Sequence, residues 1–276
     1  MRRYKQLARW GLSGLTGLVV IVINLPIITL ILNSFRRTED ILAATTIIPT
    51  NPSWVNYIYV LDRTPYLQFF RNSIIVAGGG MTLSILAAVL AGYALSRFRS
   101  RVLSTYRRWL FMVQMFPLIL ALIPLFILFR TLGLVNTYAS VIILYTVTQL
   151  PFATSMFVAY FDGIPRELEE AAQIDGYSRL QGMALVMLPL AGPAIAAVAI
   201  FTFLFSYNEY LVANIMLRNE AVYTLPVGIQ MFMQQFITDW GSLMAAATLA
   251  MLPTFVLFLF VQKYMMYGAI GSGVKG

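Results

Sequence analysis

The sequence predicts an all-α membrane protein with six transmembrane helices and with both termini in the cytoplasm. Of its 276 residues, 59% are hydrophobic and only 11% are charged, and the hydrophobic residues gather in long runs. A soluble domain carries roughly 25% charged residues, and an α-helix needs about 20 apolar residues to cross the hydrocarbon core. The mean hydropathy of +0.78 favours the same class.

Six apolar segments are long enough to cross a membrane. The first follows a basic N-terminal segment, and we interpret it as a retained helix rather than a signal peptide. Its apolar run is too long for a signal peptide, and it has no cleavage site of small residues. We expect the spans at about 11–32, 72–96, 109–130, 138–160, 189–216 and 243–263.

The distribution of Lys and Arg sets the expected orientation, because cytoplasmic loops carry an excess of both. With six spans, 13 of the 19 basic residues fall on the side that holds both termini. Five of the 11 acidic residues share that side, so it carries the whole net charge of +8. Membrane orientation therefore explains the basic surplus, and we expect contact with membrane lipid and no nucleic-acid partner.

The composition excludes several kinds of catalytic chemistry. The chain has no Cys and no His, which excludes disulfides, zinc sites built on these residues, and a Ser-His-Asp triad. It also lacks the glycine-rich motif of a phosphate-binding loop. We identify one acidic residue within the expected spans, Glu209, whereas a paired-carboxylate mechanism needs two. We therefore expect a protein that is not an enzyme, with no catalytic residues, no metal ligands and no bound cofactor.

A polar segment separates the fourth and fifth spans, with the sequence IPRELEEAAQIDGYSRLQG. Pro165 suits the first turn of a helix, and the glutamates that follow suit its positive end. Asp175-Gly176 is a turn signal that ends the helix, and a second helix then leads into the fifth span. Leu168, Ala171 and Ile174 give the first helix a modest apolar face. Five acids and one base lie within 162–175, so anionic lipid would repel this segment, and we expect a protein partner.

This segment resembles the EAA loop of ABC importer permeases. That signature reads Glu-Ala-Ala, three residues, Gly, nine residues, an aliphatic residue, one residue, and Leu-Pro. Val stands here where Ile is usual. The motif FLFSYNEYL resembles the end of the fifth span in carbohydrate permeases, with Tyr207 where Trp is usual. FFRNSIIVA and the C-terminal YGAIGSGVKG also resemble parts of the second, six-span permease of maltose-type systems. The residues that fill the EAA signature are Glu170, Ala171, Ala172, Gly176, Val186, Leu188 and Pro189.

The resemblance implies the type I ABC importer permease fold, also called MetI-like. The implied division is a cytoplasmic N-terminus with the first span at 1–32 and an external loop at 33–71. The transmembrane core follows at 72–264, with the EAA loop at 162–189, and a cytoplasmic tail ends the chain at 265–276.

The resemblance also implies the function. The chain would be the permease of an ATP-driven importer in the bacterial inner membrane, translocating a sugar, oligosaccharide or related polyol that an external binding protein delivers. The implied partners are a second permease and two ATP-binding subunits, which would bind ATP and Mg. The alternative is an ion-coupled secondary transporter or channel that acts without an ATPase, which would need coupling or selectivity groups in its spans.

Three sets of candidate site residues follow. Asn208, Glu209 and Tyr210 would line or gate the solute path, or Glu209 would make a structural hydrogen bond to a neighbouring helix. Gln230, Gln234 and Gln235 would contact the binding protein, or their loop would be an ordinary connection with a flat amphipathic helix. The C-terminal tail would reach between the two ATP-binding subunits, or it would be a frayed chain terminus. The residues expected to couple the chain to the ATPases are Glu167, Glu170, Ala171, Ala172, Asp175 and Gly176.

Overall fold

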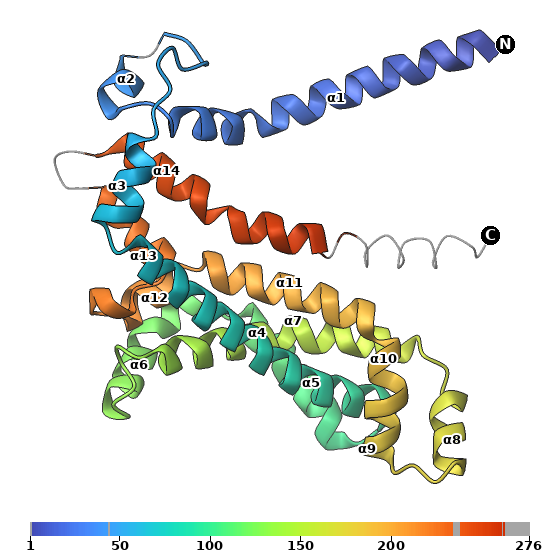
Figure 1. Ribbon diagram of the computed structural model, residues 1–276. Coiled ribbons are helices and arrows are strands. Elements are labelled where there is room, and N and C mark those ends of the chain that lie inside the picture. The colour runs from blue at the N-terminus through green and yellow to red at the C-terminus, as the bar shows by residue number, and fades with distance from the viewer. Residues whose placement is uncertain (1, 44, 234–237, 261, 263–276) are drawn as a thin grey trace. The chain divides into compact units, whose positions relative to one another are not determined.

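The computed structural model describes residues 2–43, 45–233, 238–260 and 262, and regular structure in these residues is almost entirely helical (Figure 1). The single exception among them is an isolated antiparallel bridge between Met233 and Thr238. The predicted all-α class is confirmed for this part of the chain. The C-terminal tail expected at 265–276 lies outside the described residues.

Four helices are long and apolar enough to cross a membrane by themselves. They are Leu12–Asn33 within α1 (Arg2–Asn33), α4 (Tyr66–Arg97), α7 (Tyr138–Asp162), and Trp240–Phe260, which begins with α14 (Trp240–Ala250). Two further segments pass the same test only as bent pairs of helices. The described residues therefore contain four candidate spans, or up to six if each bent pair is one span.

The first bent pair divides the segment in which we expected a single span at 109–130. Helix α5 (Arg101–Met115) and helix α6 (Leu118–Thr131) meet at 102°. Phe116 between them is extended, with φ −81° and ψ 124°. The residue before a proline is driven out of the helical region by the proline ring, so Pro117 accounts for the break.

The second bent pair lies at the entry to the expected fifth span. A continuous segment runs through α9 (Arg179–Gly182), a π-helical turn η1 (Met183–Met187) and α10 (Leu188–Leu190). It meets α11 (Gly192–Asn208) at 77°. A second break separates α11 from α12 (Leu211–Met216). The expected span at 189–216 is thus one long helix, α11, with a break and a shorter helix at each of its ends.

One compact unit combines Met1–Tyr66 with Ile229–Met251. Its short elements are α2 (Thr38–Leu42), α3 (Val55–Arg63) and η3 (Gln230–Phe232). The buried Asn56 amide donates to the carbonyls of Ser34 (2.8 Å) and Arg36 (2.6 Å). A Cβ on Gly241 would lie 2.7 Å from the Asn56 amide nitrogen, so only glycine fits there. Much of the expected external loop at 33–71 is therefore held in place by buried hydrogen bonds.

The other compact unit covers Leu67–Gly228 together with the chain after Met251. It contains most of α4, α5 to α12, η2 (Glu220–Val222) and most of α13 (Leu225–Ile229). Helices α4 and α7 pack closely, since a Cβ on Gly92 would lie 2.6 Å from the Phe157 Cβ. Phe157, Phe161, Met183 and Met187 belong to one buried cluster. This cluster supports the loop of α8 and α9, which stands at one end of the unit (Figure 1).

Candidate functional site

The polar segment between α7 and α11 folds as the sequence predicts, as a short helix followed by a fixed bend. Helix α8 (Glu167–Ile174) carries glutamates in its first turn, where the helix dipole favours negative charge. Gly176 follows with φ +92°, a left-handed conformation that glycine adopts without strain. The N–H of Gly176 donates to the Gln173 carbonyl (3.1 Å) and that of Tyr177 to the Ala172 carbonyl (3.0 Å). These bonds form a Schellman-type C-cap.

The second helix begins with a capping box immediately after the bend. The Gln181 N–H donates to the Ser178 hydroxyl (3.4 Å), and the Ser178 N–H donates to the Gln181 side-chain oxygen (2.9 Å). Each residue thereby satisfies a backbone group that the helix end leaves free. The end of α8 and the start of α9 are both fixed by local hydrogen bonds, which makes the loop a stiff bracket.

The outer surface of this bracket exposes large apolar side chains beside carboxylates. Ile174 is 86% exposed, and Leu168, Tyr177 and Leu180 are exposed as well. Large apolar side chains that are exposed together in one short loop are typical of an interaction site. We name this set the bracket surface. Glu167, Glu170, Ala171, Asp175 and Gly176, all predicted coupling residues, are exposed in the same loop.

Ala172 has a different environment from the other predicted coupling residues. Its side chain is buried, and a Cβ on Gly182 would lie 3.7 Å from the Ala172 Cβ. The small size of Ala172 therefore lets α8 approach α9 within the loop. Ala171, one residue earlier, is the alanine that is open to another surface.

A buried carboxylate that the sequence analysis did not single out attaches α8 to α4. Glu169 accepts a hydrogen bond from the Tyr93 hydroxyl and one from Nε of Arg97 over 2.9 Å. Arg97 also donates to the Ile164 carbonyl over 3.0 Å. Ala172 lies three positions after Glu169, which places both on the inward face of α8. That spacing was the one signal in the sequence that could have identified Glu169.

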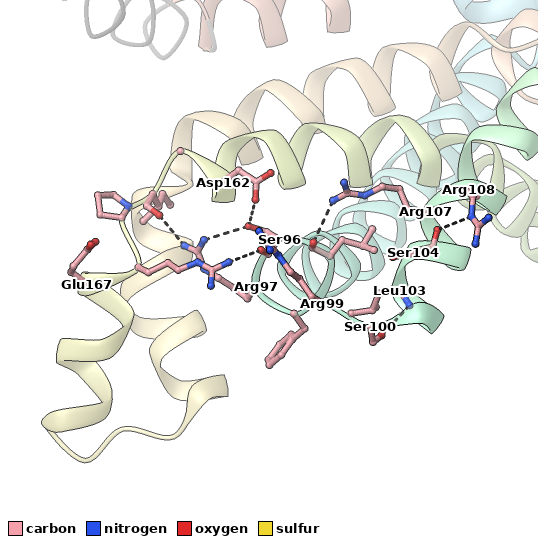
Figure 2. Close-up of a pocket in the computed structure, with 16 residues that line it drawn as sticks. Ser96, Arg97, Arg99, Ser100, Leu103, Ser104, Arg107, Arg108, Asp162 and Glu167 are labelled. Atoms are coloured by element: carbon pink, nitrogen blue, oxygen red, sulfur yellow. Dashed lines mark hydrogen bonds between the residues drawn. The ribbon is translucent and has the colours of Figure 1, made fainter.

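A second attachment joins the same end of α4 to the end of α7. Figure 2 shows the Ser96 hydroxyl and the Asp162 carboxylate pointing toward one another, with a distance of 2.5 Å between Oγ and Oδ1. The Arg166 guanidinium, at the start of α8, lies 3.5 Å from the Ser96 carbonyl oxygen. The loop is thus bonded to the core on both sides of the α7–α8 turn.

The predicted solute-path residues lie at the break between α11 and α12. The Glu209 carboxylate accepts hydrogen bonds from the N–H groups of Val212 (3.0 Å) and Ala213 (3.3 Å). The Tyr145 hydroxyl donates to the same carboxylate over 2.8 Å. Glu209 therefore caps α12 and binds the neighbouring α7, as in the structural alternative given above. Asn208 is exposed and Tyr210 is half-buried.

The residues expected to contact a binding protein are only partly described. Gln230 is exposed and begins η3, whereas Gln234 and Gln235 lie outside the described residues. The described parts of the loop at 217–242 form the short elements η2, α13 and η3. They form no single flat amphipathic helix.

Comparison with known proteins assigns the chain to a family. Residues 80–266 match the sequence profile of the binding-protein-dependent transport system inner membrane component. The chain belongs to this family. The matched range contains the whole bracket formed by α8 and α9 and also the α11–α12 break. Membership of the family agrees with the resemblance drawn from the EAA signature.

Several named members of the family are similar to this chain over most of its length. It is 34% identical to the sulfoquinovosyl glycerol transport system permease protein SmoH of Agrobacterium fabrum, over 91% of this chain and 88% of that protein. It is 32% identical to the maltodextrin transport system permease protein MdxG of Bacillus subtilis, over 94% of this chain and 93% of that protein. Such family members are permease subunits of transport systems.

A solved structure has the same fold. The chain is similar to a chain of a bacterial ABC transporter involved in the import of the acidic polysaccharide alginate, with a TM-score of 0.82 at 23% identity. The similarity covers 95% of this chain and 98% of that one. The MetI-like ABC importer permease fold is therefore confirmed.

Proposed function

We propose that this chain is the membrane-spanning permease subunit of an ATP-driven importer of the bacterial inner membrane. Its cargo is a carbohydrate, such as a sugar, an oligosaccharide or a related polyol, that an external binding protein delivers. The family supports the transport role, and relatives named for maltodextrin, arabinooligosaccharides and sulfoquinovosyl glycerol support the carbohydrate class. The same similarities favour this function over the ion-coupled transporter or channel.

The bracket surface is the observation that carries the proposal. It is a stiff, exposed feature with apolar side chains and carboxylates, at one end of its compact unit (Figure 1). Burial of Leu168, Ile174 and Tyr177 against a water-soluble partner protein contributes favourable free energy to their association. We assign this partner as an ATP-binding subunit, two of which assemble with this chain and a second permease. ATP and Mg bind on those subunits and not on this chain.

The attachment of α8 to α4 supports a lever-like transfer of movement. When the ATP-binding subunits close, they displace α8, and its bonded contacts through Glu169 carry the displacement to Arg97 at the end of α4. Rigid-body movement of this kind underlies alternating access. Glu167, Glu170, Ala171, Asp175 and Gly176 act at the docking surface, and Ala172 acts by holding α8 against α9.

The proposal includes the orientation of the chain. Each bent pair counts as one span, so six spans place both termini and the bracket in the cytoplasm, in agreement with the distribution of Lys and Arg. The α11–α12 break then lies toward the external side. Asn208, Glu209 and Tyr210 border the solute path there, and Gln230, Gln234 and Gln235 contact the binding protein.

Capture of the ATP-binding subunits by tagged permease tests the proposal. Ile174→Glu places a charge at the most exposed side chain of the bracket surface. We expect it to reduce the captured ATP-binding subunits at least about fivefold, because one buried anchor contributes more than about 1 kcal/mol. Gln173→Glu adds the same charge at the neighbouring position and serves as the control. Wild-type chain that transports its solute with no ATP-binding subunit would overturn the proposal.

A further inference from the structure

A polar cavity of about 970 Å³ lies where α4 ends, α5 begins and α7 turns into α8 (Figure 2). The whole chain is only 11% charged, yet charged residues gather in this cavity. Its lining contains five arginines and two acids, a net charge of +3. These residues are Arg97, Arg99, Arg107, Arg108, Arg166, Asp162 and Glu167.

Four of these arginines have no carboxylate partner among the described residues, and one of the four, Arg166, lies against the Ser96 carbonyl oxygen. Among the described residues the one ion pair joins Arg97 to Glu169. Arg107 donates to the Leu95 carbonyl at 3.3 Å, and Arg108 bonds only to groups of its own helix. Arg99 makes no hydrogen bond within the described structure. A planar guanidinium suits a phosphate because it offers paired N–H donors, so this cavity has the donors for a phosphate group.

A second cavity of about 240 Å³ adjoins the first and is mainly apolar. The two share Leu95, Arg107 and Asp162 in their linings. The second is otherwise lined from α5 and α7, by residues that include Leu110, Phe111, Val158 and Ala159. Thr154 lines it too, with a buried hydroxyl that has no hydrogen-bond partner among the described residues. We name the first cavity the charged chamber and the second cavity, which lies beside it, the apolar chamber.

The position of the cavities relative to the candidate spans narrows the class of ligand. Helices α4 and α7 end at Arg97 and Asp162, so the arginines lie at the level where a span leaves the hydrocarbon and lipid headgroups begin. Basic pockets between spans at this level suit anionic lipid headgroups. A ligand that fills both chambers carries an anionic group, such as a phosphate, close to a hydrocarbon chain.

We propose that the two cavities form a binding site for an anionic phospholipid. Its phosphate binds Arg99, Arg107 and Arg108, and one acyl chain enters the apolar chamber between α5 and α7. A free phosphate ion can bind the same arginines, but it has no hydrocarbon chain to occupy the apolar chamber. The proposal rests on the chain spanning a membrane and is independent of its role as an importer.

Lipid titration of the purified, delipidated transporter tests the site. Native mass spectrometry counts the dioleoyl phosphatidylglycerol bound per complex, with dioleoyl phosphatidylcholine as the neutral comparison. We expect the double variant R99Q/R107Q to bind phosphatidylglycerol about 25-fold more weakly, since each basic residue near anionic lipid contributes a factor of about five. The control is R101Q, because Arg101 is exposed at the start of the same helix and lines neither cavity.

The apolar chamber is tested separately by filling it. Ala159→Phe should weaken binding of phosphatidylglycerol, whereas Met156→Phe, at an exposed position of the same helix outside the chamber, should not. Three results would overturn the proposal. In the first, R99Q/R107Q binds phosphatidylglycerol as the wild type does. In the second, inorganic phosphate at millimolar concentration displaces the lipid while Ala159→Phe has no effect. In the third, R99Q/R107Q loses its ATP-binding subunits but keeps its lipid, which would assign the cavity to a protein partner.

Discussion

Nε of Arg97 and Oε2 of Glu169 lie 2.9 Å apart, and each side chain is more than nine-tenths buried. Arg97 is the last residue of α4, and Glu169 lies in the first turn of α8. The pair therefore connects the end of a membrane span directly to the helix that carries the bracket surface. Removing one partner leaves the other as a buried charge without compensation, which is far more damaging than losing an exposed pair.

The first prediction concerns this pair. Arg97→Met should lower the free energy of unfolding by about 3–5 kcal/mol, because Glu169 is left buried and unpaired. The double variant Arg97→Met/Glu169→Leu should recover a large part of that loss. Thermal unfolding of the purified chain in detergent, analysed as a double-mutant cycle, measures the coupling. Glu170→Gln is the exposed control, and an equally large effect there would contradict the assignment.

The bend at Gly176 should be required for coupling and not for membrane insertion. Gly176→Val forces a β-branched residue to adopt φ +92°, which costs about 1–2 kcal/mol or moves the bend. We expect the variant to insert normally and to lose stimulation of ATP hydrolysis by the loaded binding protein. Gly192→Ala is the control, since a Cβ there meets nothing within 4 Å. Stimulation of Gly176→Val at the wild-type level would refute this role.

The two alanines of the EAA motif should respond differently to the same substitution. Ala172→Glu places a charge where the side chain is buried against Gly182, so we expect α8 to separate from α9 and limited proteolysis to cleave the loop. Ala171→Glu keeps the loop resistant to protease, because its side chain is exposed, but weakens binding of the ATP-binding subunits. Equal protease sensitivity of the two variants would show that Ala172 is not buried in the assembled loop.

The Asp239 carboxylate should make stability depend on acidic pH. Burial alone would raise its pKa, but hydrogen bonds from Ser242 and Thr38 outweigh burial and lower the pKa below the ordinary value of 3.8. A pKa that is lower in the folded state stabilises the protein above the unfolded value, and this contribution is lost as pH falls through the folded one. Asp239→Asn should therefore lower the melting temperature at pH 6 and flatten its fall below about pH 4.

Melting temperature measured against pH in detergent checks this prediction. Asp40→Asn, at an exposed position of the same unit, is the control and should follow the wild-type curve. If Asp239→Asn and the wild type have the same melting temperature at every pH, this result contradicts the proposed role of the hydrogen bonds from Thr38 and Ser242.

Features encoded by neighbouring residues were predictable from the sequence. Long apolar runs identified the helices that include α4 and α7, because hydrophobic length is a property of a single segment. The turn at Asp175-Gly176 was predictable for the same reason, since a left-handed glycine after a helix depends on local backbone geometry. The EAA signature is also contiguous, and it led to the family that the comparisons confirm.

Features that depend on distant residues were not predictable in this way. The spacing of Glu169 from Ala172 indicates a shared helix face, but it does not identify the partner Arg97, which lies 72 residues away in the sequence. The breaks at Phe116 and Ala191 lie beside prolines, but a proline in a span permits either a mild kink or a full break. The inward position of Ala172 and the capping role of Glu209 likewise depend on partners that only the folded chain brings together.

The packing of Asn56 against Gly241 has a consequence for the order of events during synthesis. These two residues are separated by 185 positions in the chain, and translation adds about 5–20 residues per second. The amino-terminal segment therefore leaves the ribosome roughly 10–40 s before its packing partner exists. During that interval the Asn56 amide and the Arg36 carbonyl lack the Gly241 backbone that later packs against them, so this unit can complete its packing only after the chain has been made as far as α14.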